Sequence, residues 1–409
     1  MDFPCVRPVE AFPIQYQGRT AICLRDPMGY APQPLILGLG AYFLVSLMDG
    51  SSSVQDLAEA YANRFAQALP PEQIADLINS LEQGFFLRGS RFDQRVAAAQ
   101  AEFAALPARA AAHAGLCYSS EPSALRAELA AFFDPPGGPG RAPGTVAGSP
   151  PAGLIVPHID PRRGGVAYAH GYYQLMRRRP PDLFVILGTS HYGAGPQLFT
   201  ATMKDYATPL GNVTTDREFI RRLAARYREG DLLADELLHR NEHSIEFQAL
   251  FLAATLGILG YTVVPILVSS FHPMVLAGTS PGSDPRVASF LDALRSELAA
   301  DGRRVCIIAG VDFAHVGRKF GDERAADEAF ISWVRDEDHA LIATIERGDP
   351  EAFFAAISKD GDRRRICGLA PMYTQLALLR AQPGRLLAYD VALEAATESA
   401  VSFASLVID

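Results

Sequence analysis

The sequence predicts an α/β protein: a mixed, largely parallel sheet with helices on both faces, preceded by a small winged-helix-like domain. From residue 153 onward, short apolar runs alternate with longer segments of helical periodicity. Runs such as Phe184–Leu187 and Val305–Ala309 are apolar throughout, which is typical of parallel strands buried on both faces. Residues 1–90 form a separate unit with its own strand and helix signals.

The composition bounds the class of protein. A chain of 409 residues has room for two domains, and 49% hydrophobic with 20% charged residues is typical of a soluble globular protein. A net charge of −9 argues against a nucleic-acid partner, and no apolar run reaches the ~18 residues of a membrane span. Five cysteines without regular spacing, and no leader-like N-terminus, predict a cytoplasmic protein with reduced thiols.

Residues 1–90 predict a winged-helix-like module. The expected order is a strand in GRTAICLRD, a buried helix over Leu35–Met48, helices over 54–66 and from Pro70, and a wing from Phe86. The unit carries five Arg and no Lys against nine acidic residues, a balance of −4, whereas phosphate contacts need clustered basic residues. The strings LMDGSSSVQDLAEAY and LINSLEQGFFL resemble a PqqD-type peptide-binding module more than a DNA binder.

The rest of the chain predicts a helical linker over 91–111 and an α/β domain over 112–409, interrupted by a Pro/Gly-rich loop at 134–152. Strands are expected at 153–157, 182–188, 262–269, 304–311, 385–393 and 400–408. Helices are expected near 167–178, 216–228, 244–257, 286–299, 323–346, 350–358 and 370–381.

Chemically capable side chains follow several of these strands. His158 follows the first strand, His191 the second, and Asp312 with His315 the fourth. Ligands gather at the carboxyl ends of strands in open α/β sheets, and imidazole is the commonest metal ligand. The alternative for the two single histidines is a polar surface loop. Asp312 and His315 predict an acid/base pair, with a structural hydrogen bond at the strand end as the alternative.

Two further candidates lie at helix starts. His243 begins the helix HSIEFQALFLAATL with Glu246 one turn on, so it could orient a ligand or bind substrate; the alternative is a helix-capping cluster of Asn241, Glu242 and Ser244. Cys367 precedes a helix and follows Arg363–Arg365, which would lower its thiol pKa and make it a nucleophile or metal ligand. The alternative for Cys367 is a small buried residue.

The remaining histidines are weaker candidates. His272 ends the run VVPILVSSFH and carries a weak signal, whereas His170, His239 and His339 are expected on helical surfaces.

Six motifs in order, PHID, TSHYG, EHSIE, PILV, VDFAHVG and ICGLAP, resemble the Memo family, also called AmmeMemoRadiSam system protein B. HAGLCYSSEPSALRAELAAFF resembles the opening segment of that family, so the resemblance covers about 112–409. The family usually has PHAGY, SHH and SDFxHWG; this chain lacks the second His of SHH and the Trp. These departures bear on the shape of the substrate pocket more than on the ligand set.

The resemblance implies a fold related to the class III non-haem iron extradiol dioxygenases. It implies metal ligation by His158, His191 and Cys367, with the Cys where those enzymes have a carboxylate, and His315 as acid/base residue. The implied cofactor is a divalent metal, Fe(II) foremost, with Cu or Zn as alternatives. The implied partners are a small molecule or peptide in the metal cleft and a radical SAM protein.

Two functions follow from this reasoning. The first is a metal-dependent redox enzyme acting with O₂ on a small aromatic or peptide-borne group. The alternative is a non-catalytic protein that holds a peptide or metal in the same cleft, because thiolate in place of carboxylate changes the metal's redox properties and can itself be oxidised.

Overall fold

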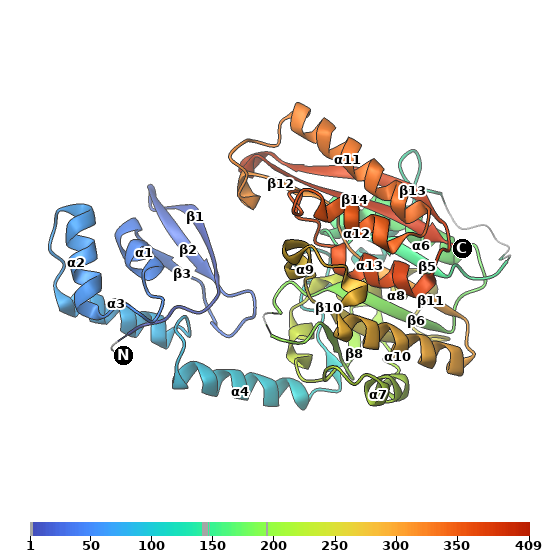
Figure 1. The fold of residues 1–409 in the computed structure, drawn as a ribbon, viewed down its shortest axis with the longest axis horizontal. Coiled ribbons are helices and arrows are strands. Elements are labelled where there is room, and N and C mark those ends of the chain that lie inside the picture. Colours follow the sequence, from blue (N-terminus) through green and yellow to red (C-terminus); the bar gives the residue numbers. More distant parts are fainter. Residues whose placement is uncertain (1–2, 141–145, 147, 194) are drawn as a thin grey trace. The chain divides into compact units, whose positions relative to one another are not determined.

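The computed structural model describes residues 3–140, 146, 148–193 and 195–409, and divides the chain into two compact units. The first unit ends at Leu106 and the second begins at Pro107 (Figure 1). The predicted Pro/Gly-rich loop at 134–152 lies partly outside the described residues. No helix in the described ranges is both long enough and apolar enough to cross a membrane.

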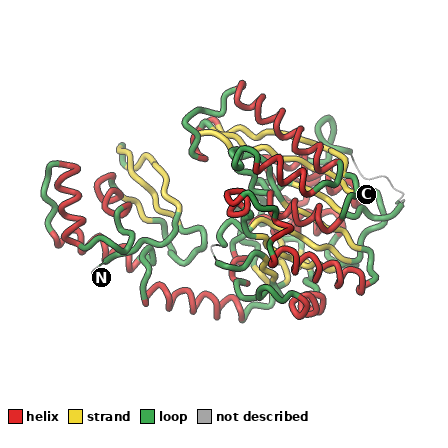
Figure 2. The backbone as a smooth tube through the Cα atoms, viewed as in Figure 1, coloured by secondary structure: helices red, strands yellow, loops and turns green. Residues whose placement is uncertain are grey.

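The first unit combines a small antiparallel sheet with four helices, which Figure 2 shows as yellow strands beside red helices. The sheet runs β1 (Glu10–Tyr16), β2 (Arg19–Arg25) and β3 (Leu35–Leu37), and the helices are α1 (Leu39–Ser46), α2 (Val54–Phe65), α3 (Pro71–Gln83) and α4 (Ser90–Ala104). The predicted capping of α2 is present, since the Ser53 side chain accepts from the Asp56 N–H in a capping box. In place of the predicted wing, Leu87 pairs with Val6 in an isolated bridge.

One predicted helix in this unit was wrong. Leu35–Met48 is not one buried helix, because Leu35–Leu37 pairs with β2 and the helix begins only after the N-cap Gly38. The apolar run continues across this boundary, so periodicity alone does not separate the short strand from the helix.

The second unit is built on an eight-stranded mixed sheet in the order β12-β14-β5-β11-β6-β10-β7, with β13 paired to β14. Its strands are β5 (Gly153–Val156), β6 (Leu183–Thr189), β7 (Phe199–Ala201), β10 (Thr262–Val268), β11 (Val305–Gly310), β12 (His315–Gly317), β13 (Gly384–Glu394) and β14 (Ser399–Ile408). The central β5, β11, β6 and β10 are parallel, and the outer pairings are antiparallel. The predicted mixed α/β class is confirmed.

Helices cover both faces of this sheet (Figure 1). One face packs against α5 (Pro122–Ala131), α6 (Pro161–Met176) and α8 (His243–Leu256). The other packs against α7 (Arg217–Arg226), α9 (His272–Ala277), α10 (Pro285–Asp301), α11 (Glu328–Glu346), α12 (Pro350–Ser358) and α13 (Leu369–Leu379). Successive strand residues alternate between the two cores, so Phe184 and Ile186 face one layer while Val185 and Leu187 face the other. Double-sided burial explains why these strands are continuous apolar runs.

A second, three-stranded sheet was not predicted from the sequence. It pairs β4 (Ala108–Arg109), β8 (Asp205–Thr208) and β9 (Gly211–Val213). Strands of two to four residues carry too little alternation to register as a pattern. Four 3₁₀ turns complete the described elements: η1 (Glu236–Arg240), η2 (Pro281–Ser283), η3 (Arg318–Phe320) and η4 (Ala395–Thr397).

Candidate metal centre

The central parallel strands end side by side, and this brings the predicted residues together. Val156 at the end of β5 pairs with Gly310 of β11, which pairs in turn with Gly188 of β6. His158, Asp312 and His191 follow these positions within two or three residues. Segments separated by more than 150 residues in sequence therefore meet at one edge of the sheet.

His158 is buried with one ring nitrogen committed to the backbone. Its Nδ1 lies 3.0 Å from the Gly310 carbonyl oxygen, which can only accept, so Nδ1 carries the proton. The lone pair is then on Nε2, 3.2 Å from Cys367 Sγ. Burial, reinforced by the charge of His191, lowers the pKa of His158 well below its ordinary value. His158 is thus a neutral imidazole with Nε2 free to bind a metal.

His191 is oriented in the same way by a carboxylate. Its Nδ1 lies 3.0 Å from Glu242 Oε1, and its backbone N–H donates to Glu242 Oε2 at 3.0 Å. Burial opposes the charged imidazole, but the Glu242 carboxylate outweighs burial and raises the pKa of His191. A carboxylate on the far nitrogen of a histidine fixes the tautomer and raises the basicity of Nε2, as in many metal sites.

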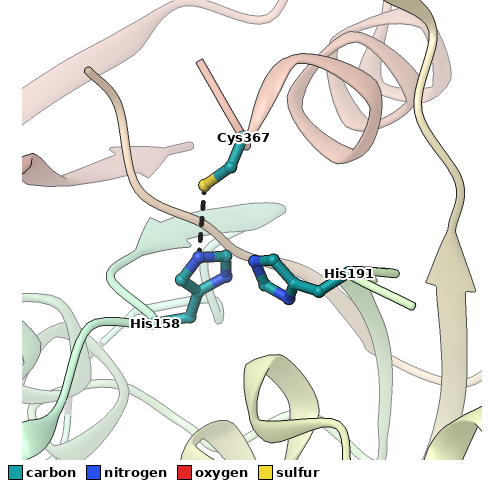
Figure 3. A group of neighbouring side chains, drawn as sticks. All are labelled: His158, His191 and Cys367. Atoms are coloured by element: carbon teal, nitrogen blue, oxygen red, sulfur yellow. Dashed lines mark hydrogen bonds between the residues drawn. The ribbon is translucent and has the colours of Figure 1, made fainter. Parts of the chain in front are cut away.

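Cys367 completes a group of three potential ligands (Figure 3). One donor atom each from His158, His191 and Cys367 lies within 4.8 Å of the other two. The Cys367 carbonyl accepts from the Thr189 hydroxyl at 3.2 Å, and the Gly368 N–H donates to the Asp312 carbonyl at 3.2 Å. These bonds tie the segment before α13 to the ends of β6 and β11.

The predicted lowering of the Cys367 pKa was wrong. Burial, reinforced by the nearby Asp312 carboxylate, raises the pKa of the thiol well above its ordinary value. The expected basic neighbours are engaged elsewhere, since Arg364 pairs with Asp338 and Arg365 with Asp322. Without a metal, Cys367 is therefore a protonated thiol whose S–H can donate to His158 Nε2. Metal binding would have to release that proton.

Asp312 and His315 lie close to the ligands but are not hydrogen-bonded to each other. Asp312 Oδ1 accepts from the backbone N–H of His158 and Ile159 at 3.0 and 3.2 Å. The His315 Nδ1–H donates instead to the Phe313 carbonyl at 3.2 Å. Burial raises the pKa of Asp312 to about 6 and lowers that of His315. The two groups interact through charge, with His315 Nε2 unprotonated.

His243 joins the cluster from the start of α8. Its ring stacks on His191 with centroids 4.8 Å apart and an interplanar angle of 18°. Its Nδ1 lies 3.3 Å from Glu242 Oε1, and Glu242 also accepts from the Ser244 N–H at 3.0 Å. Of the predicted capping cluster, Glu242 caps the helix through the Ser244 N–H, and the same carboxylate contacts the rings of His191 and His243. His191, Glu242 and His243 form a second group of donors within 4.8 Å of one another.

A pocket of about 330 Å³ adjoins His191 and Cys367. Its apolar wall includes Val268, Ile366 and Leu369. Its polar residues are Thr189, Ser190, Ser270, His272, Asp362 and Arg365. The weak candidate His272 is 45% exposed and lies 3.8 Å from Asp362. The pocket gives a small molecule access to two of the three potential ligands.

Sequence reasoning did not assign a role to Glu242 beyond helix capping, and it placed His239 incorrectly. Glu242 meets His191 across 51 residues of sequence, and no local pattern links them. His239 is fully buried rather than on a surface, with Nδ1 bonded to the Tyr206 hydroxyl at 2.7 Å and Nε2 to the Thr200 carbonyl at 2.9 Å. His239 lies in a 3₁₀ segment at 236–240, whose five residues are too few to show which face is buried from the sequence pattern.

The geometry defines a candidate metal-binding α/β protein, and the chain belongs to the Memo family. Residues 109–407 match the family model described as Memo-like protein. The chain is 30% identical over 403 residues to a MEMO1 family protein of Aquifex aeolicus, covering 98% of both chains. It is 32% identical over 266 residues to a MEMO1 family protein of Aeropyrum pernix, covering 64% of this chain and 84% of that one.

A eukaryotic relative matches as well. The chain is 30% identical over 274 residues to the protein memo-1 homolog of Caenorhabditis elegans, covering 66% of this chain and 70% of the relative. The alignment with the Aquifex protein is long enough to include the first unit, whereas the other two alignments cover about two thirds of this chain.

Proposed function

We propose that the chain is a metal-dependent redox enzyme whose metal is held by His158, His191 and Cys367. The observation that carries this proposal is the convergence of their donor atoms within 4.8 Å. Both imidazoles have Nδ1 occupied by an acceptor, so the two Nε2 atoms are available. Two imidazoles and a thiolate suit Fe(II), Cu or Zn, and we favour Fe(II) because the Memo family resembles the class III non-haem iron dioxygenases. A bound metal would supply Lewis-acid and redox chemistry.

The side chains around the ligands accept protons or orient the ligands. The Phe313 carbonyl holds the Nδ1–H of His315, and burial keeps Nε2 unprotonated at neutral pH, so Nε2 can accept a substrate proton. Glu242 orients His191 and lies beside His243. In this proposal His243, whose ring stacks on His191, assists in orienting that ligand, and Asp312 adjusts the charge near His158.

The adjoining pocket favours a small substrate with an apolar body. Its size of about 330 Å³ and its apolar wall, which includes Phe271, suit an aromatic molecule or a single side chain of a peptide. We relate the chemistry to that of the class III extradiol dioxygenases and place it in the cytoplasm, where Cys367 stays reduced. A radical SAM protein, as in AmmeMemoRadiSam systems, is our proposed partner.

The test combines metal content with O₂ consumption. The full chain, purified without oxygen, should contain about one iron per molecule, and O₂ uptake should rise with at least one member of a catechol panel. Bound metal without substrate-dependent O₂ uptake on any catechol would contradict the enzyme proposal and favour the non-catalytic alternative. Absence of any bound transition metal would contradict the metal site and the enzyme proposal, and would leave only the alternative in which the cleft holds a peptide.

Replacing His315 should separate catalysis from metal binding. Loss of a general acid/base residue lowers the rate by about 10²–10⁴-fold. His315→Ala should therefore keep the metal content of the wild type while O₂-dependent turnover falls by that factor. An unchanged turnover per folded molecule would show that His315 only holds the strand end. Loss of the metal would place His315 among the ligands.

We also propose that the first unit is PqqD-like and binds a protein or peptide. Its sheet leaves β1 and β3 as edges, which can accept an extended peptide, and its charge balance of −4 disfavours phosphate backbones. A gel-shift of the full chain with duplex DNA at low salt should show no complex. Tight DNA binding that weakens steeply with salt would overturn this assignment.

A further inference from the structure

A buried ion pair lies behind the loop that carries Cys367. The Arg364 guanidinium binds the Asp338 carboxylate of α11, and the two side chains are 3% and 0% exposed. The same carboxylate accepts from the Tyr389 hydroxyl of β13 at 2.9 Å and from the Ser402 hydroxyl of β14. Asp338 therefore joins the loop to one helix and two strands through groups that are buried, except for the half-buried Tyr389.

The network connects to two residues of the candidate metal centre, His315 and Cys367. The Arg364 carbonyl accepts from the His315 backbone N–H at 2.7 Å. Ser402 Oγ accepts from the Ala314 N–H at 2.9 Å, directly before His315. Cys367 follows Arg364 by three residues. A shift of Arg364 would therefore move His315 through a hydrogen bond and Cys367 through the chain.

The loop backbone requires such an anchor. Asp362 and Arg365, on either side of Arg364, have φ values of 57° and 53°, in the left-handed region. Residues other than glycine keep this conformation only where the surroundings hold it. The Ile366 N–H bond to Asp362 Oδ1 at 2.8 Å and the Arg365–Asp322 contact at 3.0 Å hold the ends of the turn. The Arg364–Asp338 pair holds its centre.

We propose that Arg364 and Asp338 are positioning residues that fix Cys367 and His315 relative to the two histidines. A buried ion pair contributes little net stability over apolar residues of similar size, because desolvation offsets the Coulomb attraction. Its role here is to set geometry. This inference rests on the proposed metal site for its function but makes a separate claim about the metal-free protein.

The test uses the full chain loaded with Co(II), whose bond to a thiolate gives a charge-transfer absorption. Arg364→Met removes the guanidinium, and Arg364→Met with Asp338→Leu also removes the carboxylate that would otherwise be left unpaired. The matched control is Arg7→Met in the first unit, where Arg7 (5% exposed) pairs with Asp26 (1% exposed). Both single variants leave one buried aspartate without its arginine, but Arg7 belongs to the first unit, whereas Arg364 precedes Cys367 by three residues in the second.

Both Arg364 variants should bind Co(II) about 10–100-fold more weakly, as when other supporting residues of metal sites are replaced. Their sulfur-to-cobalt absorption should weaken, and Arg7→Met should match the wild type. In the metal-free protein, iodoacetamide should alkylate Cys367 faster in both Arg364 variants, as followed by peptide mass spectrometry.

The two readouts separate the two claims. If wild type binds no Co(II), the proposed metal site fails, and the alkylation rates still decide the positioning claim. Folded Arg364 variants with wild-type cobalt affinity and absorption would overturn the inference, as would unchanged alkylation. Restored affinity in the double variant alone would also overturn it, because that result would assign the single variant's defect to the unpaired Asp338.

Discussion

Two buried carboxylates, Glu242 and Glu246, lie one helical turn apart at the start of α8, and they have different partners. Glu246 is compensated by the Arg109 guanidinium and also accepts from His113 and Tyr118. For Glu242, the described partners of the carboxylate are the His191 imidazole and two backbone N–H groups, with His243 nearby. Arg109 reaches Glu242 only at its backbone carbonyl.

The pKa does not distinguish these two carboxylates, whereas the group that partners each of them indicates its role. Burial would raise the pKa of both groups, and in both the neighbouring groups reverse that effect and lower it. The Arg109 guanidinium stays charged at every relevant pH and compensates Glu246. This ion pair, with the bond from the His113 N–H, attaches the segment 109–113 to α8. Imidazoles leave the charge of Glu242 available to tune the ring that faces the proposed metal.

The largest expected effect follows from breaking the Glu246 pair. Glu246→Gln leaves the buried Arg109 charge without its partner, which costs about 3–5 kcal/mol of unfolding free energy. Urea unfolding of the Pro107–Asp409 unit in the full chain should show this loss at pH 7. Metal content should stay near that of the wild type, since Glu246 orients none of the proposed ligands.

The pH dependence of that loss tests the cause. Arg109 and the hydrogen bonds overcome burial and lower the pKa of Glu246 from its ordinary 4.5 to about 2. The stability from the charged form is therefore complete above pH 4.5 and disappears as the pH falls towards 2. The difference between wild type and Glu246→Gln should shrink over this range. A difference independent of pH would assign the loss to packing instead of charge.

A smaller effect, on binding instead of stability, is expected for Glu242→Gln. The amide can still accept from the His191 Nδ1–H but no longer supplies charge, so metal affinity should fall by about 10–100-fold. Chelator competition measures this change directly, and Glu246→Gln is the matched control on the same helix. If the two variants lose metal equally, the proposed difference between the carboxylates is wrong.

The sequence predicts correctly those elements whose pattern lies within a short stretch of the chain. The apolar runs at 182–188 and 304–311 correspond to β6 and β11 within one residue at each end, because double-sided burial makes such strands continuous. The carboxyl ends of parallel strands meet at one edge, so His158, His191 and Asp312 were correctly expected near one another.

The wrong predictions share a physical cause, because each concerns a residue whose partner is distant in the sequence and is brought close only by folding. Cys367 was expected beside free arginines, but Arg364 is drawn away by Asp338, 26 residues earlier. Leu35–Leu37 pairs with β2 although the residues after it are helical. The orientation of His191 by Glu242 required the folded chain.

The central claim is that His158, His191 and Cys367 form one metal site, and metal analysis of the three alanine variants tests it most directly. Each variant, purified without oxygen beside the wild type, should lose its stoichiometric metal. His272→Ala is the control, because His272 lines the same pocket without belonging to the group of donors, and it should keep its metal. Stoichiometric metal retained in any two of the three ligand variants would contradict the account.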